Sequence, residues 1–416
     1  MNWLRRPVTE TQITHGARIW LYAIAIAVMV FLVLPTLLVI PMSFSASQYL
    51  EFPPRQWSLR WYQSYFSSAS WMQATMTSLK AGLLTAVVAT PLATMAAYGL
   101  HMSRVRYASG LMMLLLAPIV VPVILIGIGV FYSYVKLKLV NTLLGLVLAH
   151  SMLAIPVVML VVGSALRTFD MDQELVARSL GASRVRAFML VTLPQIRFSV
   201  VTGAVLAFLT SFDEIIVALF VSGGDNSTLT RNMFNALRDQ VDPTIAAIST
   251  IIVTVTSLLL APMVVPVILI GIGVFYAYVK LKLVNSMLGL VLAHSMLAIP
   301  VVMLVVGSAL RTYDMDQERV ARSLGASPLR AFMLVTLPQI KFAVVTGAVL
   351  AFLTSFDEII VSLFVSGGAN STLTRNMFNA LRDQVDPTIA AISTLIVAVT
   401  SLLLVFTQFV GHKKDP

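Results

Sequence analysis

The sequence contains a near-identical direct repeat. Residues 117–260 and 261–404 align without a gap at an offset of 144 positions and differ at 14 of them. Solenoid units are much shorter than this, and the internal repeats of transporters are usually visible only as weak symmetry. We therefore interpret the repeat as a recent duplication or a splice between two close paralogues, and we expect both copies to adopt the same fold.

The duplication is uneven, because residues 1–116 occur only once. We interpret residues 1–260 with a tail like residues 405–416 as one complete ancestral protein. The predicted organisation is residues 1–116 with the first two helices and an outer segment, then the two cores, then residues 405–416 with the end of the last helix and a cytoplasmic tail. Most differences between the cores are conservative, but three change the local chemistry: Leu175/Arg319, Arg184/Pro328 and Asp225/Ala369.

Long apolar runs fill both copies. Hydrophobic residues make up 58% of the chain and charged residues only 11%. Typical globular domains carry about 25% charged residues, so a soluble surface of this size could not be covered. The composition predicts a polytopic membrane protein and excludes a secreted disulfide scaffold and a DNA-binding protein. The chain has no cysteine, which rules out thiol catalysis and Cys-ligated zinc.

Six apolar segments of the ancestral unit are long enough for a spanning helix, which needs about 20 residues. They cover residues 19–42, 75–100, 108–135, 143–165 and 199–221, and a last span begins at residue 244. A polar, Trp-rich segment over residues 43–74 is expected to lie along the outer interface. With about four spans repeated by the duplication, the predicted fold class is all-α, a polytopic transmembrane helical bundle.

The basic residues predict the orientation of these spans. Arg5, Arg6 and Arg18 precede the first span, and the polar loop over residues 167–197, repeated over 311–341, carries five arginines in the first copy. Positively charged residues are enriched in cytoplasmic loops, so we predict that the N-terminus and both loops are cytoplasmic. The formal charge of +10 then reports orientation and not an anionic ligand.

The apolar stretch at the junction of the copies, residues 244–279, has two interpretations. As one helix its roughly 36 residues would be about 54 Å long, against a hydrocarbon core of about 30 Å. Pro262 and Pro266 could break it into a tight pair of spans. We favour two passes, because they keep the loop 311–341 and the Lys413–Lys414 tail inside, whereas one pass places both outside.

The first copy of the basic loop reads DQELVARSLGASRVRAFMLVTLP over residues 172–194. The pattern predicts a short amphipathic helix from Glu174 to Leu180, a break at Gly181, and a second helical run that Pro194 stops before the next span. An ordinary positive-inside loop is one interpretation. Two short helices between long spans are also well suited to docking on a soluble partner.

The loop resembles the EAA loop of permease subunits from binding-protein-dependent ABC importers, in which E-A-A is followed three residues later by Gly and then by I-x-L-P. In this chain the glutamate position of the motif is occupied by Leu175 in the first copy and by Arg319 in the second. Glu174 and Glu318 lie one residue before that position. The resemblance assigns these residues to an ATPase-coupling loop: Glu174, Ala177, Leu180, Gly181, Ala182, Ser183, Leu193 and Pro194, and in the second copy Glu318, Ala321, Leu324, Gly325, Ala326, Ser327, Leu337 and Pro338.

Two further stretches, Ser58–Tyr62 and Ser211–Val217, are similar to the second permease subunit of spermidine/putrescine importers, a MetI-like type I permease. The resemblance implies a multi-pass subunit of the bacterial inner membrane that forms a solute pathway without a cofactor, a metal or nucleic acid. Its implied partners are ABC ATPase subunits, a second permease subunit and a periplasmic solute-binding protein. The chain has no G-x-x-x-x-G-K-[ST] stretch, so we expect a transport subunit whose ATP hydrolysis occurs in a separate protein.

Two acidic pairs, Asp213–Glu214 and Asp357–Glu358, stand inside predicted apolar spans. Carboxylates within a membrane are costly and are functional by default, so we predict that these pairs line the pathway of a cationic solute such as a polyamine. The alternative is that each pair lies near an interface or bonds a neighbouring helix.

Other polar and small residues within the spans have simpler interpretations. His150 and His294 are interpreted as hydrogen-bonding residues in helix packing, in preference to a proton relay. The pairs Gly127/Gly129 and Gly271/Gly273 are expected to allow close helix packing.

Two other functions stay open. An ion-coupled secondary transporter would also contain repeats and intramembrane carboxylates, although its repeats are old and divergent. The second alternative is a recombined permease with impaired transport. This alternative arises because residues 1–116 supply only one set of the first two helices. On this hypothesis one copy packs against both helices and the other is left with unpartnered faces.

Overall fold

The computed structural model describes residues 19–102, 107–119, 121–239, 242–260, 267–314, 316–383 and 394–395. The basic N-terminus, Pro262 with Pro266, and the predicted tail 405–416 lie outside the described residues. Within the described ranges the chain is helical, with one isolated bridge between Ser45 and Trp57. It divides into two compact units, Met1–Tyr62 with Pro243–Arg375 and Gln63–Asp242 with Asn376–Pro416, which are described separately.

Six helices among the described residues are long and apolar enough to cross a membrane, and a bent pair of helices makes a seventh candidate. The six are Ile19–Met42, Ala69–Met102, Leu143–Thr168, Arg184–Asp213, Met287–Leu310 and Pro328–Asp357. The prediction of a polytopic all-α bundle is confirmed.

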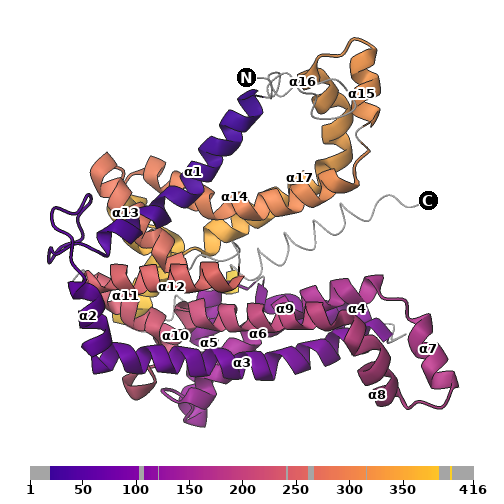
Figure 1. Ribbon diagram of the computed structural model, residues 1–416, viewed down its shortest axis with the longest axis horizontal. Helices are drawn as coiled ribbons and strands as arrows, with labels where there is room; N and C mark the ends of the chain where they lie inside the picture. Colours follow the sequence, from indigo (N-terminus) through magenta and orange to yellow (C-terminus); the bar gives the residue numbers. More distant parts are fainter. Residues whose placement is uncertain are drawn as a thin grey trace. The chain divides into compact units, whose positions relative to one another are not determined.

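Three long helices form the body of the unit that contains the first copy: α3 (Ala69–Met102), α6 (Leu143–Thr168) and α9 (Leu193–Asp213), which pack side by side (Figure 1). Small side chains allow this close approach, since α3 contributes a row of alanines to the shared core and α9 contributes Ala207. Van der Waals packing of small residues is the usual basis of helix association in membranes.

The predicted helix over residues 108–135 is not continuous. Its two parts, α4 (Ala108–Leu116) and α5 (Val123–Leu137), are bent by 96°, with the short 3₁₀ turn η3 (Ala117–Ile119) between them. Pro122 caps the start of α5 in an extended conformation, because proline cannot donate a backbone hydrogen bond within a helix.

The second copy repeats this packing in the other unit. There α14 (Met287–Thr312) packs on α17 (Leu337–Asp357) as α6 does on α9. Likewise α13 (Val267–Leu281) packs on α18 (Ile360–Val365) as α5 does on α10 (Ile216–Val221). The near-identical sequences therefore form the same helix pairs.

The first two long helices are divided between the copies, contrary to the hypothesis that one copy packs against both. α1 (Ile19–Met42) contacts α13 of the second copy and α12 (Thr244–Leu260), whereas α3 contacts α6 and α9 of the first copy. The segment that follows α1 in sequence also contacts the second copy. The Tyr276 hydroxyl on α13 accepts a hydrogen bond from the Phe52 amide at 2.6 Å.

The junction stretch contains two helices, α12 and α13, on either side of the residues that are not described. The break predicted at Pro262 and Pro266 falls outside the described residues. The number of membrane passes in the stretch stays a prediction.

Candidate functional site

The resemblance places the coupling loop between α6 and α9. The loop is formed by α7 (Asp172–Ser179), a turn, α8 (Arg184–Ala187) and the π-helical turn η4 (Phe188–Thr192), and it extends beyond the ends of α3, α6 and α9 (Figure 1). Gly181 has φ +96°, a conformation that side chains disfavour, and so it ends the first helix as predicted. The Ala182 amide donates to the Ala177 carbonyl at 3.1 Å, and Ser183 caps α8 by accepting from the Arg186 amide at 3.3 Å.

The predicted stop at Pro194 is wrong. Pro194 lies in the first turn of α9, and helical structure runs without interruption from Arg184 to Asp213. A proline in the first helical turn leaves no donor unsatisfied, and the wider π-helical turn that precedes it accommodates the change in hydrogen bonding. The second half of the loop is therefore continuous with a membrane helix.

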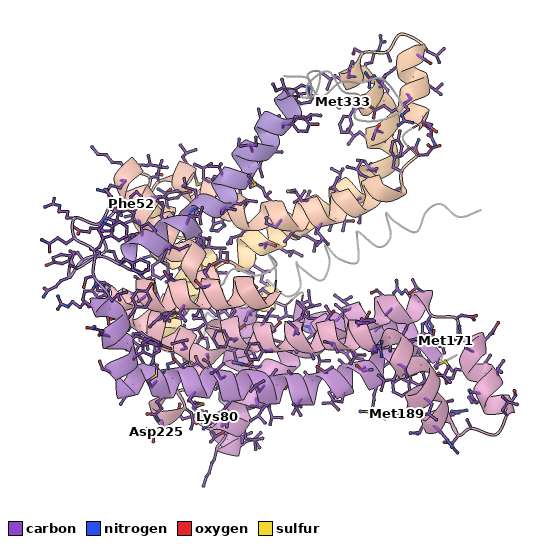
Figure 2. The ribbon with its side chains drawn as sticks, in the orientation of Figure 1. Phe52, Lys80, Met171, Met189, Asp225 and Met333 are labelled. Carbon is purple, nitrogen blue, oxygen red and sulfur yellow. The ribbon has the colours of Figure 1, made fainter. Side chains whose placement is uncertain are left out.

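The loop exposes several large apolar side chains. Leu180 is 83% exposed, Val185 69% and Leu190 65%. In the second copy the corresponding Leu324 and Leu334 have the same exposed fractions. Figure 2 shows Met171 and Met189 on the first loop and Met333 on the second. Large apolar side chains grouped on a polar loop mark an interaction surface.

The second-copy loop accommodates its sequence differences without a change of structure. Pro328 occupies the first position of α16 (Pro328–Ala331), where proline is favoured. The Arg319 guanidinium donates to the Asp316 carboxylate at 2.5 Å on the exposed face of α15 (Asp316–Ser323). Gly325 again has φ +96°.

Glu174 faces into the loop and not outward. Its side chain is fully buried and accepts hydrogen bonds from the Tyr98 hydroxyl of α3 at 2.5 Å and from the Thr192 hydroxyl. In the second copy Glu318 accepts from the Thr336 hydroxyl at 2.5 Å. Glu174 thus holds the loop together instead of forming part of its outer surface. Sequence reasoning missed Tyr98, which lies 76 residues before Glu174.

The acidic pairs lie at breaks between helices and not inside them. Asp213 is the last residue of α9, and Glu214 follows in an extended conformation. A Glu214 carboxylate oxygen accepts from the Val217 amide at 2.9 Å and so caps α10; Glu358 does the same with Val361 at 2.8 Å. The predicted span over residues 199–221 therefore consists of two helices. The Glu214 carboxylate accepts the hydrogen bond that a carbonyl of a preceding helical turn would otherwise accept, and so a new helix begins there.

The histidines form packing hydrogen bonds, as interpreted from the sequence. His150 Nδ1 lies 2.7 Å from the Ser211 hydroxyl, and His294 Nδ1 lies 2.7 Å from the Ser355 hydroxyl. The His294 Nε2 atom also lies 3.0 Å from Ser362. The first copy has Ala218 at that position, and His150 Nε2 is buried without a hydrogen-bond partner in the described part of the chain.

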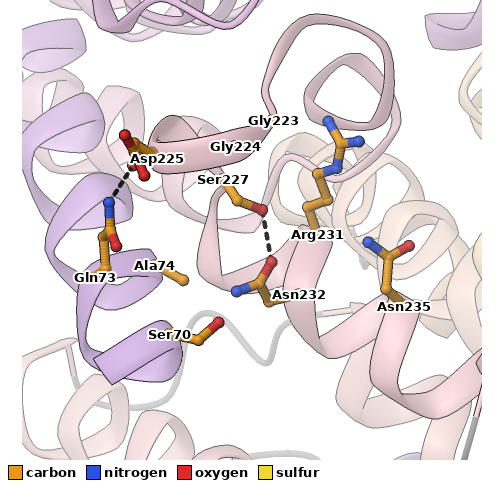
Figure 3. A pocket seen from close by; sticks show the side chains of 10 residues that line it. All are labelled: Ser70, Gln73, Ala74, Gly223, Gly224, Asp225, Ser227, Arg231, Asn232 and Asn235. Atoms are coloured by element: carbon orange, nitrogen blue, oxygen red, sulfur yellow. Dashed lines mark hydrogen bonds between the residues drawn. The ribbon is translucent and has the colours of Figure 1, made fainter. Parts of the chain in front are cut away.

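A polar cavity of about 260 Å³ lies between the first turns of α3 and the segment after α10, and it was not predicted (Figure 3). The Gln73 side-chain amide donates to the Asp225 carbonyl at 3.0 Å across it, and the Ser227 hydroxyl donates to Asn232 at 2.5 Å. The lining residues are polar or small: Ser70, Gln73, Ala74, Gly223, Gly224, Asp225, Ser227, Arg231, Asn232 and Asn235.

Arg231 closes one side of the cavity. Its guanidinium donates to the Ala218 carbonyl of α10 at 3.2 Å, and burial lowers its pKa from the ordinary value. The Asp225 carboxylate points away from this guanidinium (Figure 3). Asp225 is replaced by Ala369 in the second copy. This difference in charge between the copies is the feature of the sequence that could have drawn attention to the cavity.

The cavity and the coupling loop lie at opposite ends of α3. Gln73 and Tyr98 are 25 residues apart on this helix, a distance of about 38 Å that exceeds the hydrocarbon core of about 30 Å. Asp225 and Met171 accordingly mark opposite ends of their unit in Figure 2. The described residues contain no group of three or more His, Asp or Glu that could hold a metal ion.

Several long apolar helices, one of them continuous with a polar loop, define a multi-pass helical membrane protein. The family model described as "Binding-protein-dependent transport system inner membrane component" matches the chain twice, over residues 89–261 and 241–412. The chain belongs to this family of ABC importer permeases.

Known proteins similar to the chain include polyamine permeases. The putrescine transport system permease protein PotI of Escherichia coli is 32% identical over 240 residues, 56% of this chain and 85% of PotI. The spermidine/putrescine permease protein PotC of Haemophilus influenzae is 26% identical over 235 residues, 56% of this chain and 91% of PotC. A bacterial ABC transporter involved in alginate import matches with a TM-score of 0.46 and 13% identity, over 61% of this chain and 96% of that one.

Proposed function

We propose that this chain is the membrane-spanning subunit of an ATP-driven importer for a polyamine or a related small cationic solute. It couples to separate ATPase subunits through the loops over residues 167–197 and 311–341, which face the cytoplasm together with the N-terminus. Its other partners are a second permease subunit and a periplasmic solute-binding protein. The observation that carries the proposal is the exposed apolar surface of a loop that continues directly into a membrane helix.

The shape of the loop supports ATPase docking. Leu180 stands at the turn before Gly181, and Val185 and Leu190 follow on the second helical run, so an apolar partner surface could bury all three. Burial of one such side chain contributes about 1.5–3 kcal/mol. Because η4 joins the run to α9, a force on the loop acts directly on a membrane helix.

The acidic groups support a cationic solute. Asp225 gives the cavity at the far end of α3 a carboxylate, and the pairs Asp213–Glu214 and Asp357–Glu358 lie at helix breaks. Transporters commonly place solute sites where a membrane helix is interrupted, since free backbone groups are available there. The names of the similar polyamine permeases agree with this choice of solute.

Co-purification tests the docking surface. We expect the wild-type chain to purify with a subunit that hydrolyses ATP, and the double variant L180D/L324D to lose it. The matched control is L137D/L281D, which places the same charges on exposed positions at the ends of α5 and α13, outside the loops. An ATPase that stays bound to L180D/L324D would contradict the assigned docking surface.

A further inference from the structure

Three polar side chains connect the first-copy loop to a membrane helix that is not adjacent to it in sequence. The Tyr98 hydroxyl on α3 donates to one oxygen of the Glu174 carboxylate at 2.5 Å, and the Thr192 hydroxyl at the end of η4 donates to the other. Glu174 and Thr192 are both fully buried. A buried carboxylate depends on such bonds, because hydrogen bonds to a charged group are stronger than neutral ones and an unpaired charge is costly to bury.

Tyr98 contacts the loop a second time through its ring. The ring lies 4.6 Å, centroid to centroid, from the ring of Phe188, the first residue of η4. The same tyrosine packs against the alanine-rich core shared by α3, α6 and α9. It therefore joins the loop and the membrane core at one point.

The second copy has no counterpart of this connection in its sequence, because residues 1–116, which include α3, are not duplicated. Glu318 is only half-buried there and accepts from Thr336. The Tyr313 hydroxyl lies 3.3 Å from the same Thr336 hydroxyl. Tyr313 immediately follows α14 and replaces Phe169 of the first copy, so the second loop is held to its own helix pair instead.

We propose that Tyr98 is a positioning residue that transmits movement of the first-copy loop to α3. The inference rests on the proposed coupling of the loops to an ATPase. α3 is one helix from Tyr98 to Gln73, whose side chain bonds Asp225 in the polar cavity. Movement of the first loop would thus reach the cavity at the other end of α3.

The test uses the assembled importer with its ATPase and solute-binding protein in liposomes, with putrescine as the probe. Tyr98→Phe removes the hydroxyl and keeps the ring contact with Phe188. We expect ATP hydrolysis to persist while the ratio of putrescine taken up to ATP hydrolysed falls by about tenfold, the factor that corresponds to one hydrogen bond to a charged group. The matched control Tyr313→Phe in the second copy should leave this ratio unchanged.

Three outcomes would overturn the inference. An unchanged ratio in Tyr98→Phe, or an equal fall in Tyr313→Phe, would show that Tyr98 does not transmit movement. Loss of the bound ATPase in Tyr98→Phe would show that the residue only maintains the docking surface. A wild-type chain that binds no ATPase would overturn the proposed function itself, and this result is distinct from the three above.

A second variant covers the case in which Tyr98→Phe does not fold. Thr192→Val removes the other bond to Glu174 and leaves α3 unchanged. Its control is Thr336→Val in the second copy. We expect the coupling ratio to fall in Thr192→Val and not in Thr336→Val, and equal ratios in these two variants would overturn the inference.

Discussion

Gly273 of the second copy lies directly against Pro35 of α1. A Cβ atom on Gly273 would stand 2.1 Å from the Pro35 carbonyl oxygen, so the two backbones cross with no room for a side chain. The equivalent Gly129 of the first copy has nothing within 4 Å of the same position. The same residue in a near-identical helix is therefore a packing site in one copy and an open surface in the other.

The glycine pair gives a direct test of where α1 packs. Gly273→Leu should separate α1 from α13 and lower the free energy of unfolding by about 2–3 kcal/mol, the cost of overpacking a tight contact. Gly129→Leu should change it by less than about 0.5 kcal/mol, as at other open surface positions. Thermal unfolding in detergent measures both, and a larger loss for Gly129→Leu would place α1 on the first copy instead.

The tyrosine pair tests the segment that follows α1. The Tyr276 hydroxyl bonds both the amide and the carbonyl of Phe52, whereas Tyr132, its counterpart, is 50% exposed. Tyr276→Phe should therefore lower the free energy of unfolding by about 1 kcal/mol, and Tyr132→Phe should leave it unchanged. Denaturant titration of both variants checks this, and equal midpoints would show that residues 50–54 do not dock on α13.

The different hydrogen bonds of His150 and His294 predict that exchanging Ala218 and Ser362 has opposite effects on the stability of the two copies. Ala218→Ser should supply the missing partner of His150 Nε2 and raise the free energy of unfolding by about 1 kcal/mol, while Ser362→Ala should lower it by a similar amount by removing the partner of His294. The double exchange should be close to neutral. A loss of stability in Ala218→Ser would mean that the space beside His150 does not accept a hydroxyl.

Asp225 tests the charge of the cavity. Asp225→Asn keeps the shape of the side chain, and it keeps the bond from Gln73, which is made to the backbone carbonyl. We expect the half-saturating concentration of putrescine for uptake to rise by about tenfold, because an ammonium group loses a charged acceptor. The control Ser70→Ala alters the same cavity without a change of charge. An unchanged half-saturation in Asp225→Asn would remove the cavity from the solute pathway.

The sequence is sufficient to predict the properties that depend on neighbouring residues. Apolar length locates the unbroken helices Ile19–Met42, Ala69–Met102 and Leu143–Thr168. The left-handed turn at Gly181 follows from the glycine between two short helical patterns. The near identity of the copies correctly predicts that α14 and α17 pair as α6 and α9 do.

The properties that the sequence does not reveal depend on distant contacts. Identical glycines at positions 129 and 273 have different neighbours, because one α1 is available to two copies. Tyr98 meets Glu174 only after α3 and α7 are packed. The roles of Pro194 and Glu214 were misjudged because a π-helical turn and a helix cap depend on hydrogen bonds that hydropathy does not encode.

The central claim is that ATP hydrolysis by a separate subunit drives transport through this chain. The most direct measurement is putrescine uptake into liposomes that contain the assembled complex and the solute-binding protein, with ATP or an ion gradient as the energy source. The account predicts uptake with ATP inside the liposomes, abolished by L180D/L324D and unaffected by dissipating the ion gradients. Uptake driven by an ion gradient in the absence of any ATPase subunit would contradict it.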